Sequence, residues 1–123
     1  MFTRDYIMRQ IHQLIQVLLQ VLFRKQQEEP EQAQSILNEG LRTAFKMDLD
    51  GLCALNQTEV IALVSPSGAF HPALAVALAD LLREAATFEA AERAYWLYQA
   101  AIDKNATLSL PAFEWCEDYR RAV

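Results

Sequence analysis

The segment RDYIMRQIHQLIQVLLQVLFRKQQ, residues 4–27, decides the fold of this chain. It contains neither glycine nor proline and is rich in good helix formers, so it predicts one long helix. At about 100° per residue, one side of that helix carries a narrow polar stripe of Arg9, Gln13, Gln16, Gln20 and Arg24. Apolar side chains fill an arc of roughly 240°, whereas a helix on the surface of a globular domain needs nearer 100°. We therefore expect this helix to be covered on more than one side.

Two apolar rows run side by side along this helix. The first has the alternating four–three spacing of a helix–helix seam and consists of Ile7, Ile11, Leu14, Leu18 and Val21. The second row consists of Met8, Ile15 and Leu22. In one arrangement, one side of the helix packs on its own domain and the other on a second copy. In the alternative arrangement, the helix passes through the middle of its own domain.

We favour homodimerisation through this helix over a central core helix. The interface residues that this hypothesis names are Ile7, Ile11, Leu14, Ile15, Leu18, Val21 and Leu22. A helix lying on a membrane surface is a third alternative, but such helices usually carry lysine and arginine beside the apolar face. Here the polar stripe is mostly glutamine, and His12 at the margin of the apolar arc has no second metal ligand one turn away.

The rest of the chain predicts further helices and no strand. Only three glycines and four prolines interrupt it. After the first helix we expect helices over residues 30–46, 49–55, 57–64, 72–86, 88–104 and 112–121. The residues expected to cap helix starts are Thr3, Asp48, Asn56 and Thr87. Gly40 falls on the apolar face of its helix, where close approach of a second helix would explain it. The prediction is a single all-α domain over residues 1–123, a compact bundle of six or seven helices.

Composition excludes several classes of protein. The 123 residues suit one domain, and 53% hydrophobic with 22% charged residues excludes a disordered chain. A net charge of −5 argues against a nucleic-acid partner, which normally meets a basic face. The most apolar stretch, residues 14–23, is too short to span a membrane, and no secretory signal is evident. We therefore expect a protein of the bacterial cytoplasm. Cys53 and Cys116 do not resemble a disulfide framework, and a bridge between these two is the alternative that the sequence leaves open.

The search for chemistry finds no catalytic motif. Phosphate-binding glycine loops, paired metal-ligand motifs and nucleophile elbows are absent from the sequence. Cys53 with His71 makes a weak thiol dyad, and an enzyme would need these two and Asp50 to converge in a cleft. Asp48, Asp50 and Glu59 have only a superficial calcium-loop spacing, because Leu52 and Cys53 occupy the fifth and sixth places. We predict no catalytic residue, no cofactor and no metal.

Aromatic residues gather in the last third of the chain. A groove lined by Trp96, Trp115 and Tyr119 would bind a small molecule or peptide, whereas core packing is the favoured explanation. Trp96 points away from the apolar face of its helix, so it packs on the last helix, stacks on Arg93 or lines that groove.

Three stretches resemble a small bacterial family of unknown function: RDYIMRQI at residues 4–11 with the helix that follows, DLDGL at 48–52 and SPSG at 65–68. The resemblance extends over most of the chain and implies a cytosolic helical protein with no established catalytic residues. Residues 73–105 also resemble one tetratricopeptide hairpin. Leu78 and Leu81 fit its first helix, and Ala94, Tyr98 and Ala101 fit its second. Leu82, Ala85 and Ala106 depart from that pattern, and an array needs about three copies.

The sequence thus predicts a non-catalytic interaction or scaffold module that self-associates through its first helix. The tetratricopeptide resemblance implies a protein or peptide partner by analogy alone. Binding of a small molecule or peptide in the aromatic groove is the alternative, and an enzyme of unknown type is the least favoured.

Overall fold

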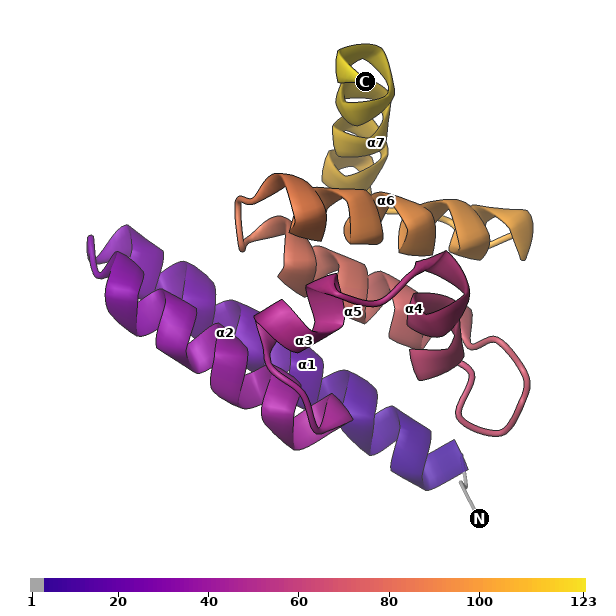
Figure 1. Ribbon diagram of the computed structural model, residues 1–123, viewed down its shortest axis with the longest axis horizontal. Helices are drawn as coiled ribbons and strands as arrows, with labels where there is room; N and C mark the ends of the chain where they lie inside the picture. Colours follow the sequence, from indigo (N-terminus) through magenta and orange to yellow (C-terminus); the bar gives the residue numbers. More distant parts are fainter. Residues whose placement is uncertain (1–3) are drawn as a thin grey trace.

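The computed structural model describes residues 4–123 and is all-helical, as predicted (Figure 1). The described residues form seven helices: α1 (Arg4–Gln26), α2 (Pro30–Phe45), α3 (Leu49–Cys53), α4 (Gln57–Leu63), α5 (Pro72–Arg83), α6 (Phe88–Asp103) and α7 (Leu110–Ala122). Thr3, the expected cap of the first helix, lies outside the described residues.

Side-chain caps start several helices where the sequence predicts them. Asp48 accepts a hydrogen bond from the backbone nitrogen of Gly51 at 3.0 Å. Asn56 and Glu59 form a reciprocal capping box with two 2.9 Å hydrogen bonds. Thr87 accepts a hydrogen bond from Ala90 at 3.2 Å. These caps satisfy backbone donors that the first turn of a helix leaves free.

Helix ends differ most from the prediction at α3, α5 and α7. Helix α3 ends at Cys53 rather than residue 55, and α5 ends at Arg83 rather than residue 86. The left-handed backbone of Ala86, with φ of 58°, turns the chain towards α6. Helix α7 begins two residues earlier than expected because Ser109 caps it, which places Pro111 in the first turn, where proline costs no hydrogen bond.

Helices α1 and α2 form a tight hairpin. A Cβ atom on Gly40 would lie 2.6 Å from Cγ1 of Val17, so only glycine lets the two helices approach this closely. Towards the end of the hairpin opposite its loop, Nε2 of Gln10 donates to the carbonyl oxygen of Ala44 at 3.0 Å. The close-approach explanation for Gly40 is thus confirmed.

Helix α5 lies between α1 and α6 and is the most buried helix of the bundle (Figure 1). Its fully buried side chains are Leu74, Ala75, Leu78, Ala79, Leu81 and Leu82. Short helices α3 and α4 pack against α6, and α7 stands at the outer side of α6, at the top of Figure 1. Among the seven helices described over residues 4–123, none covers the side of α1 that faces away from α2 and α5.

The Gly40 contact predicts an unusual effect of alanine. Gly40→Ala gains about 1 kcal/mol of helix propensity. It also forces Val17, a β-branched side chain with one favoured rotamer in a helix, out of its position. We expect urea denaturation to show a net loss of about 1–2 kcal/mol, as overpacking usually costs more than propensity returns. Adding Val17→Ala removes the clash, so the double variant should lose less than the sum of the two single variants. A Gly40→Ala variant more stable than the original would contradict this account.

Candidate interaction surface

The first of the two apolar rows on α1 faces the core of its own chain. Ile7, Ile11, Leu14 and Val21 are buried, and Leu18 packs partly buried against the same core. This placement corrects the hypothesis that the whole first row meets a second copy. The four–three spacing is real, but α2 and α5 of the same chain cover it.

The other side of α1 carries a row of large apolar side chains that the described residues of the chain leave exposed. Met8, Ile15, Leu19, Leu22 and Phe23 are each 40–54% exposed. We call these five residues the exposed α1 row. Ile15 and Leu22 of the predicted interface belong to it, whereas Met8, Leu19 and Phe23 were not among the predicted interface residues.

The basic side chains at the end of this row are held by acidic partners within the chain. Nη1 of Arg24 lies 3.0 Å from Oε1 of Glu29, and the Arg24 guanidinium stands 5.7 Å from the centre of the Phe23 ring. Nζ of Lys25 lies 3.1 Å from Oε1 of Glu84. The row therefore ends in paired charges, unlike the lysine-flanked apolar face of a helix that lies on an anionic membrane.

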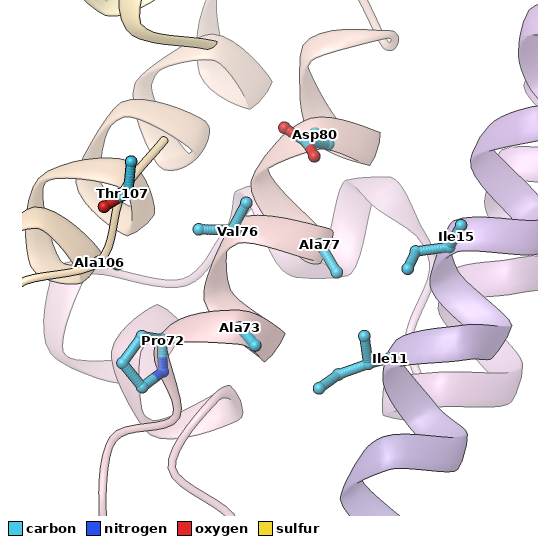
Figure 2. A pocket seen from close by; sticks show the side chains of 9 residues that line it. All are labelled: Ile11, Ile15, Pro72, Ala73, Val76, Ala77, Asp80, Ala106 and Thr107. Carbon is cyan, nitrogen blue, oxygen red and sulfur yellow. The ribbon is translucent and has the colours of Figure 1, made fainter. Parts of the chain in front are cut away.

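A groove of about 460 Å³ runs along the α5 edge of the row (Figure 2). Ile11 and Ile15 of α1 form one wall and point towards Ala77 across the groove. Its remaining lining residues are Pro72, Ala73, Val76, Ala77 and Asp80 of α5, with Ala106 and Thr107 from the loop before α7. Small side chains on α5 keep the groove open, and Ile15 belongs both to the groove and to the exposed row.

Asp80 is the acidic group of this groove, and its carboxylate accepts a hydrogen bond from a side chain of α6. The buried Tyr98 donates its hydroxyl proton to Oδ1 of Asp80, and Nη1 of Arg83 lies 3.9 Å from the same oxygen. Burial raises the pKa of Asp80, while the Tyr98 hydrogen bond and the Arg83 charge act in the opposite direction. Burial and the hydrogen bond to Asp80 also raise the pKa of Tyr98, so the tyrosine stays the proton donor of the pair.

The aromatic residues predicted to line a second groove are engaged with one another or with arginine. The ring centres of Trp115 and Tyr119 lie 5.4 Å apart, and Tyr119 stacks on Tyr95 at 4.7 Å. Trp115 also contacts Tyr98 at 5.7 Å and carries the Arg83 guanidinium 5.6 Å above its ring. These contacts join α7 to α6 and account for the half-buried state of both residues.

Trp96 has a different neighbour. The Arg93 guanidinium lies 4.8 Å from the centre of the Trp96 ring, one of the contacts considered for it from the sequence. Nη2 of Arg93 donates to the carbonyl oxygen of Leu55 at 2.9 Å, and Arg93 is only 9% exposed. Arg93 and Trp96 thus connect α6 to the turn between α3 and α4, away from the α6–α7 ring stack.

The residues considered for catalysis have other positions and partners. Burial raises the pKa of Cys53 above its usual range, and the charges acting on this thiol belong to Arg93, Glu89 and Asp50. His71 occupies the N-cap position of α5, but its side chain makes no cap hydrogen bond and its Nδ1 atom is buried without a partner. Burial also raises the pKa of Cys116 to about 11. Both thiols are therefore protonated at neutral pH, which is the unreactive form of cysteine.

Residues 4–123 contain no group of three histidine, cysteine, aspartate or glutamate side chains that could hold a metal ion. Asp48 and Glu59 of the superficial calcium-loop pattern are occupied as helix caps. None of the described helices is long and apolar enough to cross a membrane.

The described residues thus define an all-helical protein in which one face of α1 is uncovered. A family model described as "Family of unknown function (DUF6483)" matches residues 1–56, from α1 to the cap of α4. The resemblance seen at residues 4–11 and 48–52 is confirmed, while residues 65–68 and the tetratricopeptide-like hairpin lie outside the match. No curated protein and no solved structure matches the chain.

Asp80 predicts a pH dependence of stability whose sign follows from its raised pKa. Between the ordinary aspartate pKa of about 3.9 and the raised pKa of folded Asp80, the folded chain holds a proton that the unfolded chain has lost. Rising pH therefore weakens the fold through this group. Urea denaturation from pH 4 to pH 7 should show the original chain losing stability relative to Asp80→Asn, whose amide oxygen still accepts from Tyr98. An Asp118→Asn variant on the exposed side of α7 controls for loss of a surface charge, and a constant difference for Asp80→Asn would refute the assignment.

Arg93 predicts a large loss on truncation. Arg93→Ala leaves the Leu55 carbonyl without its donor and removes the contact with Trp96, so we expect a loss of about 1–3 kcal/mol in the free energy of unfolding. At urea concentrations below the unfolding transition, the tryptophan fluorescence of Arg93→Ala should differ from that of the original chain, because Trp96 has lost the Arg93 guanidinium. Arg121→Ala, on a residue with three-quarters of its side chain exposed, should lie within about 0.5 kcal/mol of the original chain. Equal losses for the two variants would contradict the structural role of Arg93.

Proposed function

We propose that this chain is a non-catalytic interaction module of the bacterial cytoplasm that self-associates through the exposed α1 row. The observation that carries the proposal is the exposure of five large apolar side chains on one face of a helix whose opposite face lies in the core. Single exposed apolar residues are ordinary, whereas a contiguous apolar surface on a soluble protein usually marks a site of interaction.

The mechanism is burial of this row against an equivalent surface. Full burial of one leucine or phenylalanine side chain contributes about 1.5–3 kcal/mol, and half of that is still available to side chains that are about half exposed. Met8 and Phe23 are separated by about 22 Å along the helix axis at 1.5 Å per residue. Because α2 and α5 hold α1 in place, little conformational entropy is lost when a partner binds.

Other features of the chain agree with this role. Cys53 and Cys116 are both free thiols, as expected in a reducing compartment. The α5–α6 hairpin resembles a tetratricopeptide hairpin in part of its residue pattern, and its first helix forms the floor of the groove beside the row. The competing proposal of a ligand groove at Trp96, Trp115 and Tyr119 is weaker, because ring stacking and arginine contacts already engage these side chains.

Leu19→Glu tests the proposal. Leu19 is 54% exposed, so the variant should keep its helix content by circular dichroism while a charge in the row opposes association. Light scattering over a concentration series should give the mass of two chains for the original protein and of one chain for Leu19→Glu. Leu18 is less suitable because it packs partly against the chain's own core.

Leu110→Glu is the matched control. Leu110 is 68% exposed on α7, so the same substitution adds the same charge away from the row and should leave the dimer intact. A strict monomer for the original chain at high concentration would overturn the proposal. Dissociation by Leu110→Glu but not by Leu19→Glu would move the interface to α7.

A further inference from the structure

We propose that His12 makes self-association through the exposed α1 row sensitive to pH: two chains pair while its imidazole is neutral and separate when it is protonated. This inference rests on the self-association proposed above and adds its regulation. The fold itself leaves the imidazole available, because the exposed side chain of His12 makes no hydrogen bond, ion pair or ring contact with any of residues 4–123.

His12 stands among the side chains of the row. Around α1, at about 100° per residue, it lies between Leu19 and Phe23. Five exposed residues alternate in steps of four and three, which is the spacing of a helix–helix seam: Met8, His12, Ile15, Leu19 and Leu22. A partner that covers the exposed α1 row therefore covers the imidazole as well.

A two-fold pair buries two imidazoles whichever way its helices run, because both copies use the same patch. When the whole row is buried, parallel helices bring His12 level with the His12 of the second copy. Antiparallel helices bring Met8 level with Phe23 of the second copy, and His12 level with its Leu19. The imidazole lies inside the contact in both cases, since residue 12 falls well within the row that runs from residue 8 to residue 23.

Neither copy of α1 brings a carboxylate close enough to stabilise a protonated His12 in such a pair. Arg9, one turn away on the same helix, is a cation, and Asp5, the only acidic residue of α1, lies about 10.5 Å away along the axis. In the antiparallel pair, residues 15–23 of the second copy face this level and carry no charge. In the parallel pair, residues 8–16 of the second copy add Arg9 and a second histidine.

The helices that pack against α1 supply no carboxylate to His12 either. Helix α2 approaches α1 at Val17 and α5 faces it at Ile11, and His12 points about 140° away from the first and about 100° away from the second. The acidic residues of the chain beside α1 have partners of their own: Glu29 with Arg24, Glu39 with Arg42, Glu84 with Lys25 and Asp80 with Tyr98.

Protonation of His12 therefore opposes the pair. Histidine ordinarily changes its charge near pH 6.5, and burial in apolar surroundings disfavours the charged form. Each chain takes up one proton at His12 when the pair separates in acid. The dissociation constant of the dimer should thus rise as the pH falls below about 6.5, by at most about a hundredfold per pH unit, because two protons are bound per dimer.

A pH series of the dimer dissociation constant tests the switch. Light scattering on dilution series between pH 8 and pH 5.5 should show the constant of the original chain rising at least about tenfold in acid. His12→Gln, whose side chain is polar but never charged, should keep one constant throughout. His71→Asn removes the other histidine of the chain and leaves a residue that suits a helix N-cap, so this control should keep the pH dependence.

Two further variants separate His12 from other causes. Asp80→Asn removes the carboxyl at the edge of the groove, and its dimer should still weaken in acid. His12→Leu completes the apolar seam, so its dimer should be at least as tight at pH 5.5 as the original dimer at pH 8. A His12→Leu dimer weaker than the original one at pH 8 would overturn the place of His12 in the contact. Circular dichroism at each pH checks that all variants keep their helices.

The outcomes also separate the switch from self-association itself. A two-chain mass whose dissociation constant is the same at pH 8 and pH 5.5 overturns the switch and retains the dimer. A constant that rises equally in the original chain and in His12→Gln overturns the role of His12 and likewise retains the dimer. A one-chain mass at every concentration and every pH overturns self-association and this inference with it.

Discussion

The close contact between Gly40 and Val17 fixes the rest of the structure. It sets the separation of α1 and α2, and thereby which face of α1 the hairpin covers. Helix α5 covers a second face, where Ile7 and Ile11 are buried, and none of the helices described over residues 4–123 covers the third. The row is therefore exposed because α1 has more apolar surface than its neighbouring helices cover. An apolar arc wide enough for three neighbours receives only two from its own domain.

The groove follows from the same geometry. Helix α5 packs on α1 on one side and on α6 on the other, and its residues Ala73, Val76 and Ala77 line the groove between α1 and the loop before α7. Larger side chains there would fill this gap from within. Small ones leave an apolar depression directly beside Ile15, so the exposed row and the groove form one continuous surface. Asp80 at its end does not disturb this character, because the buried Tyr98 already supplies the hydrogen bond that its carboxyl needs.

The fold was largely predictable from the sequence, because helix signals in this chain are local. The caps at Asp48, Asn56 and Thr87 act within three residues, and the prolines at residues 30 and 72 mark helix starts. The over-wide apolar arc also indicated that α1 needs more than one neighbour. Which row would face the core was not predictable, since both have suitable spacing and the choice depends on where α5 docks. The groove was missed for the same reason: its walls come from residues about 60 positions apart in the chain.

The position of the family match bears on how an interface of this kind achieves specificity. Residues 1–56 contain the whole exposed row, whereas the α5 wall of the groove lies beyond them. A row of exposed apolar side chains alone attracts many apolar helices with little discrimination, because hydrophobic burial has no direction. Discrimination requires a shape that only one partner fills. In this chain such a shape is offered by Ala73, Val76 and Ala77, which lie outside the match, whereas the apolar row of the proposed self-association lies inside it.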